Sequence, residues 1–242
     1  MTRRVKDVTD TAKRVGSGVR DGVKDLVSPE DGRASRWEEH REARRAELVE
    51  AAVAAIDEHG AGASIAQVSA SAGVSRPVLY RYFADKDDLY RAVGAWGAQQ
   101  VIDGLLPVLL TDTPIRERVE QGCDVYLRLI AAHPNVFFLL VEHPTTDDPL
   151  ADGKEMVAAT IARTLGDVLR DLGLDAAGAE PWAHGLVGLG LSTGEWWLRR
   201  RTMSRAAVSR YLGSFVWHAF EGIAAEHGVV VDRRGKLRLV AE

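Results

Sequence analysis

Apolar residues recur at steps of three or four along almost the whole chain from residue 35 onward. In residues 36–59, for example, Leu48, Ala52 and Ile56 fall on one side, and Gly60 follows. Such spacing is typical of amphipathic helices, and a glycine after the last apolar position is a common helix stop. The pattern therefore predicts an all-α fold. The expected helices span residues 36–59, 64–72, 75–83, 85–110, 115–132, 135–142, 151–172, 181–201 and 204–227.

The two ends of the chain depart from this pattern. Near the C-terminus, residues 229–231 and 237–240 are apolar and flank a glycine-containing turn, which predicts a short β-hairpin. At the N-terminus, residues 1–34 are polar and rich in glycine, yet seven apolar residues still recur at helical spacing. We expect either a marginal amphipathic helix that needs a partner surface or a disordered tail. The seven are Val5, Val8, Ala12, Val15, Val19, Val23 and Leu26.

The composition narrows the class of protein. The chain has 242 residues, 46% of them hydrophobic, and a single cysteine, Cys123, so an intrachain disulfide framework is excluded. The first residues lack the apolar core of a signal peptide, and the longest apolar run is far shorter than a membrane span, so we expect a cytoplasmic protein without a membrane partner. The formal net charge is −4, and all of it lies after residue 91, because residues 1–91 are neutral. DNA binding would therefore require a local basic face in the N-terminal third.

Such a face is predicted in residues 64–90. Ser64 and Gln67 have the spacing of a capping box, and Gly73 lies between two short helices, which is the arrangement of a helix-turn-helix. In the second helix Leu79 and Phe83 are four residues apart and are expected to face the core. The opposite side carries residues that suit a DNA groove, because arginine matches guanine edges and tyrosine hydroxyls reach phosphates. These residues are Arg76, Pro77, Tyr80 and Arg81.

Residues 45–90 resemble the DNA-binding end of the TetR family of transcriptional regulators. The resemblance rests on RAELVEAA, on IAQVSASAGVS and on the spacing AGVS-x-x-x-LY-x-x-F-x-x-K, which ends at Lys86. It implies a three-helix DNA-binding domain at 35–91, after an extension at 1–34, and a helical ligand-binding and dimerisation domain at 92–242. The chain departs from the commoner family pattern at Arg76 and Pro77, and at Tyr82, which leaves the operator sequence open.

The resemblance implies a role for each residue of the motif. Base contacts are expected from Arg76, Pro77, Val78 and Arg81, at the helix that Ser75 caps. Phosphate contacts are expected from Arg45, Ser64, Tyr80, Tyr82 and Lys86. Structural alternatives remain, since Tyr82 shares the side of Leu79 and Phe83, Val78 can serve as a spacer, and Arg45 can belong to an ion-paired face.

The same resemblance implies a homodimer and a small-molecule effector, and no cofactor. One recognition helix reads only a few base pairs, so two are needed. The expected dimer face combines two stripes: Val208, Leu212, Phe215, Val216, Ala219 and Ile223, and Leu186, Leu189, Trp196 and Trp197. Residues expected to line the effector cavity are Trp96, Ile102, Tyr126, Ile130, Phe138, Trp182, Leu186 and Glu195. Their mostly apolar nature favours a fatty acid, an acyl thioester or a hydrophobic drug. For any single one of them, an ordinary core position is the favoured alternative.

The resemblance thus implies a ligand-responsive transcriptional repressor, and the sequence offers two alternative functions. GLSTG at 190–194 matches the G-x-S-x-G motif of serine hydrolases, but that motif needs a strand before the serine. The N-terminal stripe can instead dock on a protein partner, or its excess of basic residues can lie along DNA. The seven histidines are scattered, so no metal site is expected.

Overall fold

The computed structural model describes residues 31–142, 151–232, 235 and 237–239, and there the fold is all-α with one small hairpin, as predicted. Contacts divide the chain into two compact units, Met1–Ala46 and Glu47–Glu242. The described part of the first unit is the beginning of helix α1 (Asp31–His59), which starts five residues before its expected start. The possible helix at 1–30 and the expected loop at 143–149 lie outside the described residues.

The N-terminal helices of the second unit surround one apolar core. The end of α1, α2 (Ile65–Ser71) and α3 (Arg76–Leu79) pack with the start of α4 (Lys86–Leu109). Ser64 forms the predicted capping box with Gln67, and the Asp85 carboxylate accepts a hydrogen bond from the Asp88 backbone N–H at the start of α4. Because each cap satisfies N–H groups that the helix leaves free, these helix starts are determined locally.

Helix α3 is shorter than predicted. It ends at Leu79 instead of continuing to residue 83, and the Tyr82 N–H donates to the Leu79 carbonyl three residues back. This tighter turn lets Phe83 enter the core before Asp85 begins α4. The capping prediction for Ser75 is correct in backbone conformation only, since its side chain makes no capping hydrogen bond.

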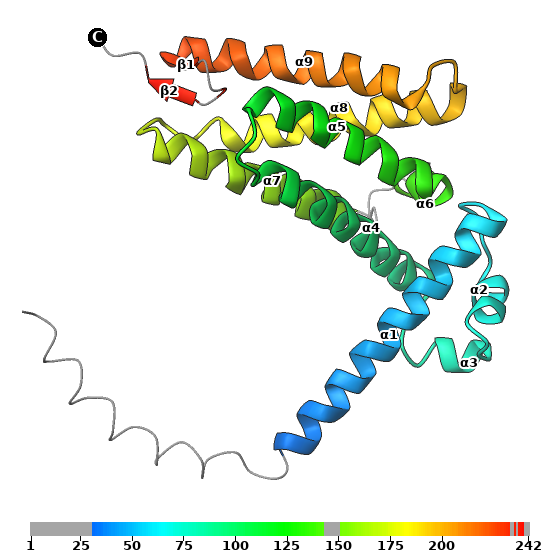
Figure 1. Ribbon diagram of the computed structural model, residues 1–242. Coiled ribbons are helices and arrows are strands. Elements are labelled where there is room, and N and C mark those ends of the chain that lie inside the picture. The colour runs from blue at the N-terminus through cyan, green and yellow to red at the C-terminus, as the bar shows by residue number, and fades with distance from the viewer. Residues whose placement is uncertain (1–30, 143–150, 233–234, 236, 240–242) are drawn as a thin grey trace, which may run out of the picture. The chain divides into compact units, whose positions relative to one another are not determined.

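The remaining helices form a layered bundle (Figure 1). Helix α5 packs against α9 and α4, and α7 packs against α8 and α4. Helix α6 contacts α4, α5 and α8 and adds Val136 and Leu139 to the N-terminal core. The bounds are α5 (Ile115–Ala132), α6 (Pro134–Glu142), α7 (Ala151–Asp171), α8 (Ala179–Arg200) and α9 (Arg205–Glu226).

The predicted hairpin is present at the end of α9. Strand β1 (Val229–Val231) pairs antiparallel with β2 (Leu237–Leu239), with Val230 opposite Arg238. The carbonyl of Gly235 accepts a hydrogen bond from the Ile115 N–H at the start of α5. The hairpin is therefore held against the bundle.

The hydrolase alternative is wrong. GLSTG lies wholly inside α8, so Ser192 follows a helical residue and not a strand, and the sharp strand-to-helix turn that exposes a nucleophilic serine is missing. Gly194 has a packing role instead. A Cβ there would fall within 3 Å of Ile130, Phe137 and Tyr126 side chains.

Candidate DNA-binding surface and effector cavity

The turn between α2 and α3 presents the second helix outward. Gly73 has φ +62°, a left-handed conformation that side chains with a Cβ rarely adopt, and the Val74 N–H donates to the Ser69 carbonyl. Leu79 and Phe83 are each 1% exposed in the core. Burial of these two side chains fixes which side of α3 faces solvent.

The solvent side of α3 carries the predicted groove residues. Arg76, Pro77 and Arg81 are exposed, and Tyr80 is 47% exposed. Within the described part of the chain, neither Arg76 nor Arg81 has an acidic partner within ion-pair distance. A solvent-facing strip with two unpaired guanidinium groups and a phenol remains, which is chemically suited to a nucleic acid.

The other predicted DNA-contacting residues differ in how freely they are presented. Ser75 is exposed, and Val78 is half-buried. Ser64 is exposed, but its hydroxyl is held by Gln67 at 2.7 Å. Tyr82 is half-buried against the core, as the structural alternative for it proposed.

Lys86 and Arg45 also have contacts within the protein. The Lys86 ammonium lies 4.8 Å from the centre of the Tyr90 ring. Arg45, in the first unit, is half-buried and has a partner. Their contacts to phosphate remain predictions.

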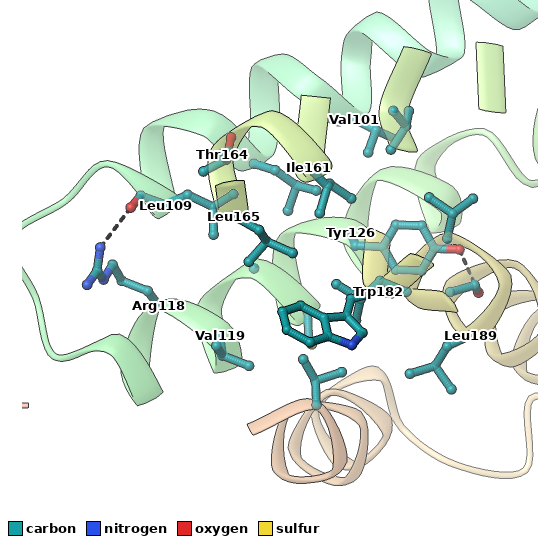
Figure 2. A pocket seen from close by; sticks show the side chains of 18 of the residues that line it. Val101, Leu109, Arg118, Val119, Tyr126, Ile161, Thr164, Leu165, Trp182 and Leu189 are labelled. Carbon is teal, nitrogen blue, oxygen red and sulfur yellow. Dashed lines mark hydrogen bonds between the residues drawn. The ribbon is translucent and has the colours of Figure 1, made fainter. Parts of the chain in front are cut away.

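A large cavity lies among helices α4 to α9 of the second unit. Its volume is about 440 Å³, and its walls are almost entirely apolar. Figure 2 shows side chains from several helices converging on it, among them Val101, Ile161, Leu165 and Trp182. Val229, Val231 and Leu237 of the hairpin also line it. A volume and lining of this kind suit a drug-sized apolar ligand.

Five of the residues expected at the cavity do line it, and three do not. The lining residues are Trp96, Tyr126, Ile130, Trp182 and Leu186. Ile102 faces a separate small hollow between α4 and α7. On α6 it is Phe137 that lines the cavity, whereas Phe138, about 100° further round the helix, lies 4.9 Å from the Arg199 guanidinium. Glu195 accepts a hydrogen bond from the same Arg199 at 3.0 Å, which holds its carboxylate outside the lining.

The residues predicted to line the cavity included none from α7, α9 or the hairpin, and Arg118 of α5 was not among them. The signal for α7 was present, because Ile161, Leu165 and Val168 recur on one side of the helix. Periodicity identifies an apolar side, but it does not distinguish a side that faces a cavity from one that faces solid core.

Two titratable groups show how dry the cavity wall is. The Tyr126 hydroxyl donates to the Gly190 carbonyl at 2.7 Å, and burial raises its pKa well above the ordinary value (Figure 2). Burial, aided by nearby Glu120, raises the pKa of the Cys123 thiol to about 12. Both pKa values are raised for the same reason, because the charged form of a buried group loses its hydration.

Helix α4 connects the cavity to the helix-turn-helix. Helix α4 lines the cavity with Trp96 and, seven residues earlier, buries Leu89 in the N-terminal core. The Tyr90 hydroxyl reaches the carbonyls of Ala61 and Ala63 before α2, at 3.3 and 3.1 Å. A shift of α4 would therefore be transmitted to the helix-turn-helix.

A second connection runs through His133, which lines the cavity between α5 and α6. Its Nδ1 lies 2.6 Å from Oδ2 of Asp57 on α1, and its ring meets that of Trp96 edge-on at 5.1 Å between centroids. Asn135 donates to the Asp57 backbone carbonyl at 2.9 Å. The His133 side chain thus contacts both Trp96 of the cavity wall and Asp57 of α1.

The predicted dimer face on α8 and α9 is partly turned inward. Val208, Leu212 and Val216 are buried within the chain, and Trp197 is buried beside Trp196. The large exposed apolar residues on these two helices are Trp196 and Phe215, which belong to the predicted face, and Tyr211, which does not; they are 41, 64 and 66% exposed. The apolar stripe of α9 is present, but much of it packs in the protein's own core.

The described residues hold no group of three or more side chains able to ligate a metal. No individual helix among them is long and apolar enough to cross a membrane, although α5 and the start of α6, bent by 97°, meet that test as a pair.

Both parts of the chain match known protein families. Residues 48–93 match the model described as "Bacterial regulatory proteins, tetR family", and residues 105–230 match that described as "Tetracyclin repressor-like, C-terminal domain". An HTH-type transcriptional regulator of Mycobacterium tuberculosis is 34% identical over 202 residues, which cover 82% of this chain and 86% of that protein.

Two further proteins are similar at lower identity. The HTH-type transcriptional activator FasR of Mycolicibacterium smegmatis is 28% identical over 181 residues, covering 73% of this chain and 83% of that protein. The regulator FadR from Bacillus subtilis, crystallised in complex with stearoyl-CoA, superposes with a TM-score of 0.55 at 18% identity, over 69% of this chain and 95% of its own. That likeness establishes a shared fold.

Proposed function

Because this chain belongs to the TetR family of transcriptional regulators, we propose that it binds a two-fold symmetric operator as a homodimer and that an apolar small molecule changes this binding. The chain is a regulator and not an enzyme. A regulator of transcription acts at the chromosome, which supports the cytoplasmic location expected from its sequence. The DNA-binding part would end near residue 91, inside the continuous helix α4.

The observation that carries the proposal is the outward side of α3. Two exposed arginines without acidic partners among the described residues, next to Pro77 and Tyr80, suit the major groove, where arginine binds guanine and apolar atoms meet the thymine methyl. We assign base contacts to Arg76, Pro77, Val78 and Arg81, beside Ser75, and phosphate contacts to Arg45, Ser64, Tyr80, Tyr82 and Lys86.

The dimer is supported by the exposed apolar side chains of α8 and α9. Trp196, Tyr211 and Phe215 are large, and aromatic side chains often supply most of the energy of an interface. A two-fold axis through this face would place two recognition helices on one side of a duplex, about 34–36 Å apart.

The effector is supported by the cavity. Its apolar wall and its volume of about 440 Å³ favour a fatty acid, an acyl thioester or a hydrophobic drug. FadR of the same fold is crystallised with stearoyl-CoA, which supports the acyl choice. Trp96, Tyr126, Ile130, Trp182 and Leu186 would contact the apolar part of the ligand.

The effector would act by a population shift. A ligand that fits the cavity better in one position of α4 and α6 favours that position, and Tyr90 and His133 transmit it to the DNA-binding helices. The size of the response is limited by the difference in ligand affinity between the two states.

We propose that the regulation is repression, in which the dimer occupies its operator and lowers transcription. FasR is named an activator, so the direction has its own test. Transcription in vitro from a promoter carrying the selected operator should fall when the protein is added. A rise would establish activation and leave the DNA-binding assignment intact.

The recognition helix is tested with Arg81→Ala. Duplexes that bind the full chain are first selected from a randomised library, and affinities are then measured on a selected and a scrambled duplex. Because an arginine–guanine contact contributes about 1–3 kcal/mol and each dimer has two, we expect a loss of at least about thirtyfold on the selected duplex. Binding to the scrambled duplex should change far less.

The matched control is Arg163→Ala, which removes an exposed arginine from α7. This variant should bind the selected duplex like the unmodified protein, and both variants should remain dimers. Full specific binding by Arg81→Ala would refute the assignment of α3.

A further inference from the structure

The apolar cavity has one charged side chain in its wall that nothing in the described structure neutralises. Arg118, on the first turns of α5, lines the cavity and is half-buried. Its Nη1 donates to the carbonyl of Leu109, near the end of α4, at 2.9 Å. Its Nε is buried and has no hydrogen-bond partner.

The other charged or basic side chains of the lining are engaged. Glu221 lies 3.1 Å from Nδ1 of His218, and His133 lies 2.6 Å from Asp57. His227 meets the Trp182 ring edge-on, and Lys154 has a partner. The guanidinium of Arg118, by contrast, has no carboxylate within 4 Å among the described residues.

A cation in this position has an energetic cost that the protein alone does not offset. A guanidinium stays charged at every physiological pH, and a charge taken from water into apolar surroundings is unfavourable unless it is paired. Its bond to the Leu109 carbonyl occupies one edge of the group. Among the described residues, neither Nε nor Nη2 has a hydrogen-bond partner, and the edge that these two atoms form matches two oxygens of a carboxylate or phosphate.

The position of Arg118 gives the ligand a direction. In Figure 2 it lies at one end of the labelled side chains, beyond Leu109 and Val119, whereas Tyr126 and Leu189 lie at the other end. The lining continues along α4 from Leu109 back to Trp96, thirteen residues or about 20 Å of helix, toward the DNA-binding end. An anion at Arg118 would therefore leave an apolar chain pointing toward Trp96 and His133.

We propose that Arg118 is the recognition group for the anionic head of the effector, a carboxylate or phosphate oxygen pair on a single long apolar chain. This proposal rests on the effector cavity proposed above, and it makes the cavity selective for ligands with an anionic head. Arg118 holds the head at the end of α4, and the tail fills the cavity toward the helices that move. An uncharged molecule of equal length lacks this contact.

The test compares three probes on the full chain by calorimetry: palmitate, the uncharged hexadecanol, and palmitoyl-CoA. We expect the unmodified protein to bind palmitate or palmitoyl-CoA at least about tenfold more tightly than hexadecanol, since hydrogen bonds to charged groups contribute more than neutral ones. Arg118→Met should abolish this preference and leave hexadecanol binding within about twofold, because the apolar wall is kept. Arg118→Lys, which keeps the charge without the planar edge, should retain part of it.

The control is Arg116→Met, two residues before Arg118. It removes an exposed arginine that is paired with Glu120, and it should leave all three affinities unchanged. Dependence on Arg118 for palmitate identifies a carboxylate, and dependence for palmitoyl-CoA alone identifies a phosphate. Equal losses for charged and uncharged probes in Arg118→Met would show that Arg118 only supports the end of α4, and would overturn the inference. Binding of hexadecanol as tight as that of both anions would also overturn it while leaving the apolar cavity function standing. Failure of all three probes would overturn both.

Discussion

Cys123 shows at the residue scale how the cavity changes the chemistry of a side chain. Its thiol lines the cavity, and burial beside Glu120 raises its pKa from 9.0 to about 12. The reactive species is the thiolate. At any pH below both pKa values, the thiolate fraction of the buried cysteine is about a thousandfold smaller than that of the ordinary one. We therefore predict that iodoacetamide at pH 8 modifies the folded protein on the order of a thousandfold more slowly than the protein in urea, as followed by mass spectrometry.

The same cysteine then reports on cavity occupancy. Because the chain has one cysteine, every modified thiol is that of Cys123. Palmitate should slow its modification further, and the rate should rise steeply as pH approaches 12. Equal rates in folded and unfolded protein would contradict the burial of this thiol.

The element scale separates what sequence alone determines from what it does not. The starts of α2 and α4 were predictable because Ser64, Gln67 and Asp85 satisfy N–H groups within a few residues. The end of α3 and the choice of Phe137 over Phe138 were not, because each depends on how another helix approaches. The recognition strip was predictable for a related reason, since Leu79 and Phe83 alone orient it.

The contact between Asp57 and His133 carries a prediction at this scale. Asp57→Asn weakens the link between α1 and the cavity wall, so palmitate should still bind while its effect on DNA affinity shrinks. We expect the coupling free energy to change by roughly 0.5–2 kcal/mol. It is measured from operator affinities with and without saturating palmitate, with ligand affinity determined separately.

The matched control for this contact is Glu58→Gln, which changes the neighbouring, exposed carboxylate. It should preserve the full coupling. If Asp57→Asn responds to palmitate as the unmodified protein does, α4 alone transmits the signal and His133 has no part in it.

At the scale of the whole molecule, charge and symmetry explain how an acidic chain can bind DNA. The net charge of −4 arises after residue 91, in the helices that would form the dimer and hold the effector, while the N-terminal third is neutral and presents Arg76 and Arg81 on one solvent-facing strip. Specific binding then depends on using that strip twice, so the exposed side chains of α8 and α9 matter as much as α3 does. Sequence periodicity placed the apolar stripe of α9 but did not separate its inward residues from its outward ones, because both lie on a helix with broad apolar coverage.

This dependence predicts that disrupting the dimer face abolishes operator binding without unfolding the protomer. Phe215→Glu places a charge on a side chain that is 64% exposed in the single chain, so helix content and the melting temperature should hold. A central aromatic side chain contributes about 2 kcal/mol to an interface, and a two-fold axis makes it occur twice. The dissociation constant of the dimer should therefore rise by about a thousandfold. Sedimentation should show a monomer, and operator affinity should fall with it. The control Leu110→Glu alters an even more exposed apolar residue at the end of α4 and should leave the dimer intact. If Phe215→Glu is still a dimer that binds the operator, the interface lies elsewhere.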